Sequence, residues 1–231
     1  MKIIKNEKLI QRNGKIGQYT SLAALIVLGI GMYISFSKPE SITYSVVCLV
    51  LGFILSQAGM FMGSRWGKSP RPDEKLDAGL KGLHSDFSIY HYTASANHLL
   101  VGPSGLWILL PYHQRGKIYY EKNRWKLKGG GFLQGYMRIF GQEGLGRPNV
   151  EAETEIKNLR KFFAGKMDEA EIPEIKPILV FTTDDVELDA GDSPIAALKL
   201  KQLKEFMRQG GKNRALTSEQ IKTLTDILPT P

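Results

Sequence analysis

A basic segment rich in aromatic residues holds the side chains best suited to bind a charged partner. Between Pro111 and Arg147 there are eight basic residues and only two acids. Basic groups beside aromatic rings can hold single-stranded nucleic acid by phosphate contact and base stacking. The same composition also fits an ordinary solvated surface, or a patch that lies on anionic lipid headgroups. The nucleic-acid-binding candidates are Arg115, Lys117, Tyr119, Lys122, Arg124, Trp125 and Lys126.

Other residues that could do chemistry lack the spacing of a known site. His84, His91 and His98 are seven residues apart, which matches neither one helix face nor a zinc motif. We expect them to be surface or hydrogen-bonded core residues. The acids between Asp184 and Asp192 are expected to form a solvated loop. The glycine-rich stretch 128–148 contains no phosphate-loop motif, and no metal site or nucleophile is predicted.

A β-hairpin is predicted where two apolar runs flank a turn. His98–Val101 and Leu106–Leu110 are separated by Gly102-Pro103-Ser104-Gly105. The stretch NHLLVGPSGLWILL, residues 97–110, resembles the core of the nuclease-related domain (NERD) family. The resemblance extends more weakly over residues 73–228. It implies a restriction-endonuclease-like, PD-(D/E)xK fold with a mixed sheet.

The resemblance also implies where a catalytic site would lie. The family pattern has an Asp before the histidine and Glu-x-Lys at the end of the second strand, so that two carboxylates hold Mg²⁺ and a lysine stabilises developing charge. This chain has Asn97, Leu110 and Tyr112 at those positions and keeps only Glu74, which matches an acid in the first helix. An amide and a leucine cannot replace two anionic ligands, so we expect a degenerate site, no enzyme activity, no metal and no cofactor. Mg²⁺ enters only if other acids have replaced the lost ligands.

The elements around this hairpin predict an α/β domain. A helix is expected over 73–83, with Asp73 as its N-cap, followed by strands near 87–92, 98–101, 106–110 and 117–120. A helix capped by Asn149, a buried strand over 178–182 and a helix over 200–208 follow. The last helix, 218–228, begins with a capping box from Thr217 to Gln220. The soluble domain is therefore assigned to residues 74–231, after a basic linker over 64–73.

Two charge-free stretches before this domain are long enough to cross a bilayer. Residues 19–36 and 41–63 each span about 27–34 Å at 1.5 Å per residue, against a hydrocarbon core of about 30 Å. Lysines and arginines flank both outer ends, in the basic segment 1–18 and after residue 63. The positive-inside bias therefore predicts a multi-pass plasma-membrane protein with its N-terminus and soluble domain in the cytosol. A cleaved signal peptide ending near Ser37 is the alternative.

Small residues on the second span allow close helix packing. Packing within the hairpin is the first interpretation, and a homodimer through Gly52, Ser56, Gly59 and Gly63 is the second. Neither span contains an ionisable residue, which argues against a transporter. The single cysteine, Cys48, excludes a disulfide framework.

The sequence thus predicts a membrane-anchored, catalytically degenerate NERD-like protein that binds nucleic acid or a protein partner. One alternative is a structural module that lies on anionic lipid. The other is an active Mg²⁺-dependent nuclease with relocated ligands. The net charge of +8 does not distinguish them, because flanking lysines and arginines account for part of it.

Overall fold

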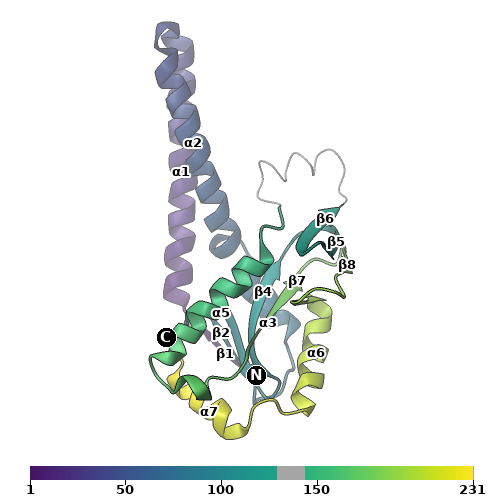
Figure 1. The fold of residues 1–231 in the computed structure, drawn as a ribbon. Helices are drawn as coiled ribbons and strands as arrows, with labels where there is room; N and C mark the ends of the chain where they lie inside the picture. The colour runs from purple at the N-terminus through teal and green to yellow at the C-terminus, as the bar shows by residue number, and fades with distance from the viewer. Residues whose placement is uncertain (129–143, 231) are drawn as a thin grey trace. The chain divides into compact units, whose positions relative to one another are not determined.

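The computed structural model describes residues 1–128 and 144–230, which form two compact units (Figure 1). One unit is helical and comprises Glu7–Arg71. The other combines Met1–Asn6 with Pro72–Pro231 around a mixed sheet. The predicted class, a mixed α/β protein with long apolar helices near the N-terminus, is confirmed. The predicted glycine-rich stretch, including Arg138, lies mostly outside the described residues.

The helical unit is an α-hairpin. Helix α1 (Glu7–Ser37) is joined through the 3₁₀ turn η1 (Pro39–Ser41) to α2 (Ile42–Met62), and the π-helical turn η2 (Gly63–Gly67) follows. The first helix begins twelve residues before the charge-free stretch that predicts it. Its first turns, EKLIQR, consist of residues with good helix propensity apart from one isoleucine, so the helix can begin before the apolar stretch.

Small residues bring α1 and α2 together. A Cβ at Gly52 would lie 2.6 Å from the Leu28 side chain, and one at Gly31 would lie 2.7 Å from Cys48 Cβ. Gly59 is buried against the backbone of Ser21. Gly52 and Gly59 are therefore occupied within the hairpin. A homodimer through Gly52, Ser56, Gly59 and Gly63 stays a prediction, and it would depend mainly on Ser56 and Gly63.

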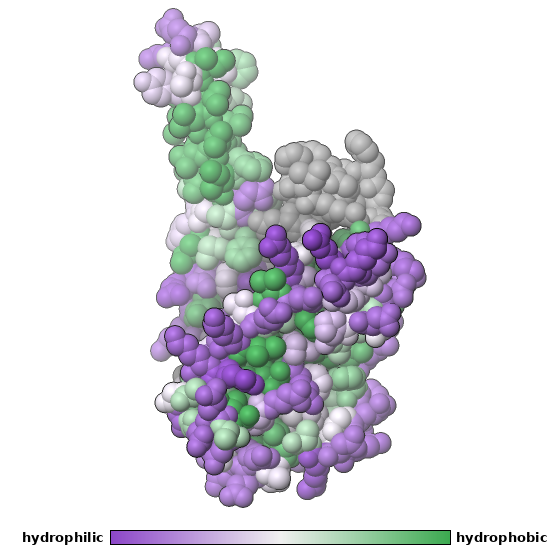
Figure 2. Space-filling model, viewed as in Figure 1, coloured by the Kyte–Doolittle hydropathy of each residue, from purple (hydrophilic) through white to green (hydrophobic). Residues whose placement is uncertain are grey.

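The outward faces of both helices are apolar. Leu25 is 67% exposed and Leu49 is 62% exposed, and the surface of the hairpin is hydrophobic along most of its length (Figure 2). Both helices are long and apolar enough to cross a bilayer. Such surfaces are costly in water, which suits a lipid environment.

The first strand of the α/β unit precedes the hairpin. Strand β1 (Lys2–Lys5) pairs in parallel with β2 (Ser88–His91), and Ile4 is buried in the core. The sequence analysis treats residues 1–18 as one basic segment. The structure instead divides this stretch between a sheet strand and the start of α1. Four residues are too short for a period-two pattern to reveal the strand.

The main sheet has six strands in the order β1-β2-β3-β4-β7-β9. The central strands are β3 (His98–Gly102), β4 (Gly105–Tyr112) and β7 (Ile175–Phe181), and β9 (Ala196–Lys199) forms the far edge. Strands β2, β3 and β4 form the predicted antiparallel meander, and β4 pairs in parallel with β7. Residues 178–181 are fully buried, as their continuous apolar run predicts.

Helices cover both faces of this sheet (Figure 1). One face packs against α5 (Pro148–Ala164) and α7 (Ser218–Ile227), and the other against α3 (Pro72–Gly79) and α6 (Leu200–Lys212). The capping box that begins α7 is confirmed. Helix α5 instead begins at Pro148 with Arg147 as its N-cap, because the Asn149 side chain accepts a hydrogen bond from Trp125 Nε1 at 2.8 Å.

A second sheet of three strands has the order β6-β5-β8. It consists of β6 (Arg124–Lys128), β5 (Gly116–Glu121) and β8 (Val186–Asp189). Lys122 and Asn123 form the β5–β6 turn, and both have positive φ values of 51° and 60°. Strand β8 is formed by part of the acidic stretch that the sequence assigns to a loop. Val186 is buried, but charged residues alternate with the apolar ones in this short strand, so its sequence resembles that of a solvated loop.

Substitution of Gly59 tests the packing of the hairpin. Gly59→Val should destabilise the hairpin by about 1–3 kcal/mol, because its Cβ would lie 3.1 Å from Ser21 Cα. Gly29→Val is the matched control, since no atom lies within 4 Å of a Cβ there. SDS titration in mixed micelles, followed by circular dichroism, measures both. Equal stability of the two variants would contradict the observed packing.

Candidate functional site

The positions that the family pattern assigns to metal binding lie at one end of the β3–β4 hairpin. Leu99 pairs with Ile108, and this register, continued by two residues, places Asn97 opposite Leu110. Tyr112 is two residues further along the same face of β4. The structure therefore brings together all three positions on the face that packs against α5.

Two carboxylates from α5 reach this end of the hairpin. The side-chain amide of Asn97 donates a hydrogen bond to Glu155 Oε1, and its backbone N–H donates to Oε2 at 3.3 Å. The Tyr112 hydroxyl donates to Glu151 Oε2 at 2.6 Å. Glu151 and Glu155 are four residues apart, so they project from one side of the helix. Acids thus converge on the degenerate positions.

The sequence analysis did not identify these two acids. They follow Asn97 by more than fifty residues, and only the packing of α5 on the sheet brings them to it. One signal was present, however. Glu155 lies on the stripe formed by Ala152, Leu159 and Phe163, all of which are buried, and Glu155 itself is only 6% exposed. An acid on the buried stripe of a helix requires hydrogen-bond donors, which Asn97 supplies.

Burial and nearby negative charge keep Tyr112 protonated. Burial raises the pKa of the Tyr112 hydroxyl, and the charges of Glu151 and Glu155 and the hydrogen bond to Glu151 raise it further. Tyr112 therefore acts as a neutral donor where the family pattern has a cationic lysine. Its ring packs on Phe181, with 5.7 Å between centroids, and Leu110 is buried beside it.

The remaining family acid lies on a different helix. Glu74 is in the first turn of α3, and α3 packs on the face of the sheet opposite to α5. The side chains of Asn97 and Tyr112 instead donate hydrogen bonds to acids of α5. Within residues 1–128 and 144–230, no group of three or more His, Cys, Asp or Glu side chains is placed to hold a metal ion.

Beneath α3, a second polar cluster is buried. His91 and His98 are cross-strand neighbours whose Nδ1 atoms are 2.8 Å apart, so one ring donates to the other. His91 Nε2 is 3.0 Å from Asp77 Oδ1. Both histidines are almost fully buried, which confirms the hydrogen-bonded core interpretation for this pair, whereas His84 is exposed beside Asp86.

Lys5 connects this cluster to the N-terminal strand. Its ammonium lies 3.0 Å from Asp73 Oδ2 and 2.5 Å from Asp77 Oδ2. Burial alone would lower the pKa of Lys5, but the hydrogen bonds and charges of the two aspartates outweigh burial and raise it. The cluster thus holds β1 against α3.

The predicted nucleic-acid surface lies on the exposed face of the three-stranded sheet. Lys117 forms ion pairs with Glu187 and Asp189 of β8 at 3.1 and 3.2 Å, and these pairs raise its pKa. Lys126 lies 2.6 Å from Glu121 and 5.8 Å from the centre of the Tyr119 ring. Two of the predicted cations are therefore offset by acids.

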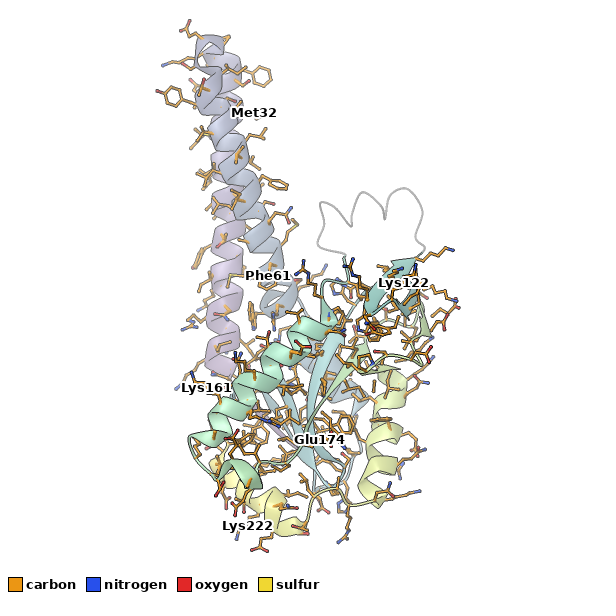
Figure 3. All side chains as sticks on the ribbon, viewed as in Figure 1. Met32, Phe61, Lys122, Lys161, Glu174 and Lys222 are labelled. Carbon is orange, nitrogen blue, oxygen red and sulfur yellow. The ribbon has the colours of Figure 1, made fainter. Side chains whose placement is uncertain are left out.

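Trp125 is not available for base stacking. It is 8% exposed, packs edge-on against Tyr120, and donates its indole N–H to Asn149. Its alternate position on β6 directs it to the core side of the sheet, which a count of basic and aromatic residues does not reveal. Arg115, Lys122 and Arg124 are exposed, with Lys122 at the β5–β6 turn (Figure 3). These three are the cations that remain free to meet a phosphate among the predicted residues.

Removal of the Lys5 ammonium tests the buried cluster. Lys5→Met should destabilise the α/β unit by about 3–5 kcal/mol, because it removes the ammonium that pairs with the buried Asp73 and the nearby Asp77. Hydrogen exchange of the β1 amides should accelerate as well. Lys2→Met, on the same strand but exposed, is the control. Chemical denaturation gives the free energies, and similar values for both variants would refute the role of Lys5.

Removal of the Tyr112 hydroxyl tests the α5 contacts. Tyr112→Phe should cost about 1–2 kcal/mol, because the hydrogen bond to a carboxylate is lost while the ring remains. Since the pKa of Tyr112 is raised in the folded state, the unfolded chain releases this proton first as pH rises. The difference between the two proteins should therefore be constant below pH 10.0, the ordinary tyrosine value, and shrink above it. Tyr119→Phe should show neither effect in denaturation at each pH.

Comparison with known proteins does not assign the chain to a family. No protein-family model matches it, and neither a curated protein nor a solved structure matches it. The geometry of the site and the sequence resemblance over residues 97–110 are therefore the two indications of function.

Proposed function

We propose that this chain is a membrane-anchored binding protein whose α/β unit is a NERD-like, restriction-endonuclease-like domain without nuclease activity. The partner we favour is single-stranded nucleic acid. The single observation that carries the proposal is the pairing of Asn97 with Glu155 and of Tyr112 with Glu151. These neutral donors occupy carboxylate oxygens that a metal ion would need, and they stand where the family pattern has ligands.

The hairpin is the proposed anchor. Its exposed leucines and isoleucines favour lipid, and its connectivity favours a helical pair that enters and leaves on one side. Strand β1 and the chain after Pro72 belong to one unit, so both ends of the hairpin must lie on the same side of a bilayer. Cleavage near Ser37 would remove β1 from the sheet, which disfavours a signal peptide. The basic flanks favour the cytosol for that side, and the plasma membrane is the proposed location.

The proposed binding surface centres on the β5–β6 turn. Arg115, Lys122 and Arg124 are exposed, and Tyr119 is half-buried beside them on the sheet. Among the described residues, the exposed face of this sheet carries four cations and three carboxylates, which are Lys117, Arg124, Lys126 and Lys128 with Glu121, Glu187 and Asp189. The surface is therefore only mildly basic, and we expect weak, salt-dependent binding without sequence preference.

A relocated nuclease site is the second candidate. Glu151 and Glu155 are two carboxylates at the position where the family pattern expects a metal, and Mg²⁺ needs only one or two carboxylates besides water and phosphate oxygens. In that case a metal would have to displace Asn97 and Tyr112 from both acids. The lipid-surface alternative rests on the same exposed cations as nucleic-acid binding.

Incubation of the full chain, held in neutral phosphatidylcholine nanodiscs, with single- and double-stranded DNA and either Mg²⁺ or Mn²⁺ tests the proposal. We expect no cleavage, and binding of single-stranded DNA that weakens about three- to tenfold in Lys122→Gln/Arg124→Gln because two phosphate contacts are lost. Lys157→Gln/Lys161→Gln, which removes the same charge from the exposed side of α5, should bind normally.

Three outcomes would contradict this function. Cleavage that disappears in Glu155→Gln would establish the relocated nuclease. Binding to phosphatidylglycerol vesicles without binding to DNA, when both depend on Lys122 and Arg124, would favour the lipid-surface module. Equal DNA binding by all variants would exclude the β5–β6 turn as the binding surface.

A further inference from the structure

A cavity of about 750 Å³ lies at the opposite end of the β3–β4 hairpin from Asn97. Three parts of the chain form it. They are the connection between α3 and β2, the C-terminal end of α6 with the segment that follows it, and one side of α7. Pro103, in the hairpin turn, contributes to its wall. Its volume is typical of sites that hold a small molecule.

The rim of this cavity is strongly basic. Arg208 and Lys212 come from α6, Arg214 from the following turn, and Lys222 from α7. Figure 3 shows Lys222 on α7, far from Lys122 in the same unit. Among the described residues that line the cavity, Asp86 is the one carboxylate, and it lies 3.1 Å from His84 Nδ1. The described lining thus holds four Lys and Arg side chains and one acid, whereas cations and acids are nearly balanced on the β5–β6 sheet.

Interactions within the chain explain only part of this positive charge. Arg208 has one weak, exposed pairing at 3.6 Å with Glu205, a neighbour on its own helix. Lys212 lies in the last turn of α6, where the helix dipole accounts for one positive charge. The dipole does not account for Arg214 and Lys222, which approach the cavity from different elements. Helix α7 also begins in the cavity wall, at Ser218, and so adds its positive end.

The inner wall is apolar. Pro103 and Ile221 line the cavity and are half-buried, so they present apolar surface to it, and the nearly buried Leu83, Phe87 and Leu216 form the core behind them. Gly211 is also in the lining, and a Cβ there would make ordinary contacts with the Phe87 ring at 3.4 Å and with Pro103 at 3.8 Å. A ligand that fits must therefore combine an anionic group at the rim with an apolar or aromatic part against this wall.

We propose that this cavity binds a small molecule that carries both a phosphate group and an apolar or aromatic portion, as a nucleotide does. The phosphate would lie among Arg208, Lys212, Arg214 and Lys222. Their charged groups would donate hydrogen bonds to it that are stronger than those between neutral groups. The apolar portion would lie against Pro103 and Ile221, the apolar lining residues that keep exposed surface. A lipid headgroup offers the same phosphate, so the source must be separated by experiment. This site is distinct from the β5–β6 surface and does not depend on the function proposed above.

Calorimetric titration of the full chain in phosphatidylcholine nanodiscs tests the site, with ADP, pyrophosphate and adenosine as probes. We expect ADP to bind more tightly than pyrophosphate, and adenosine not to bind detectably. Lys212→Gln/Lys222→Gln should weaken ADP at least about tenfold, because two charge-assisted contacts are lost. Lys157→Gln/Lys161→Gln should leave ADP affinity unchanged.

A steric variant provides a test that leaves the charges in place. Gly211→Leu adds a Cβ at an ordinary contact distance from Phe87 and Pro103, and its larger side chain would take up part of the space between the cations and the apolar lining. It should abolish ADP binding without lowering thermal stability. Circular dichroism checks that stability.

The outcomes separate the sources of phosphate. ADP binding that both cavity variants reduce supports the proposal with a soluble ligand. Binding of phosphatidylglycerol vesicles but not of ADP, lost in the same variants, supports it with a lipid source. The proposal is overturned if neither probe binds, if both cavity variants bind like the unsubstituted chain, or if only long single-stranded DNA binds there.

Discussion

The parallel pairing of β1 with β2 decides how this chain is organised. Parallel neighbours cannot be joined by a tight turn and need a connection of a dozen residues or more. Here that connection contains the whole helical hairpin and α3. Lys5 strengthens the pairing, because its ammonium joins the last residue of β1 to Asp73 and Asp77 on α3. A segment that would otherwise be an N-terminal anchor thus becomes an insertion within one unit, and the unit cannot be complete without residues on both sides of it.

At one end of the β3–β4 hairpin, the acids of α5 constrain which side chains can stand at positions 97 and 112. An acid as buried as Glu155 is tolerated only with hydrogen-bond donors, and Asn97 supplies two of them. An aspartate at position 97 would instead place a second carboxylate against Glu155, where the Asn97 amide now donates a hydrogen bond. Burial and the two glutamates raise the pKa of Tyr112, so its phenol stays neutral beside them. A lysine at this position would be charged. Asn97 and Tyr112 are therefore matched to the acids of α5, and the four side chains form one hydrogen-bonded arrangement.

Local patterns predicted the elements whose signals lie within a short window. The capping box at Thr217, the turn at Gly102–Gly105 and the apolar run before Thr182 each specify their own element, and each is present. Other features depend on residues far apart in the chain. Glu155 meets Asn97 only after α5 packs on the sheet, and β8 becomes a strand only beside β5. The burial of Trp125 has the same origin, since composition records its aromatic ring but not the side of the sheet to which it points.

The positive charge of the chain is likewise a property of several surfaces and not of one. Cations in the segment that suggested nucleic-acid binding are partly offset, because the fold brings the acids of β8 against Lys117. Cations from α6 and α7, which are unremarkable along the sequence, gather around a cavity with one carboxylate. Since an unpaired charge is felt within about 8–10 Å at physiological salt, the second group acts on a ligand more strongly than the first. The density of basic residues along the chain therefore located a charged segment, while the arrangement of acids around it decides where an anion is held.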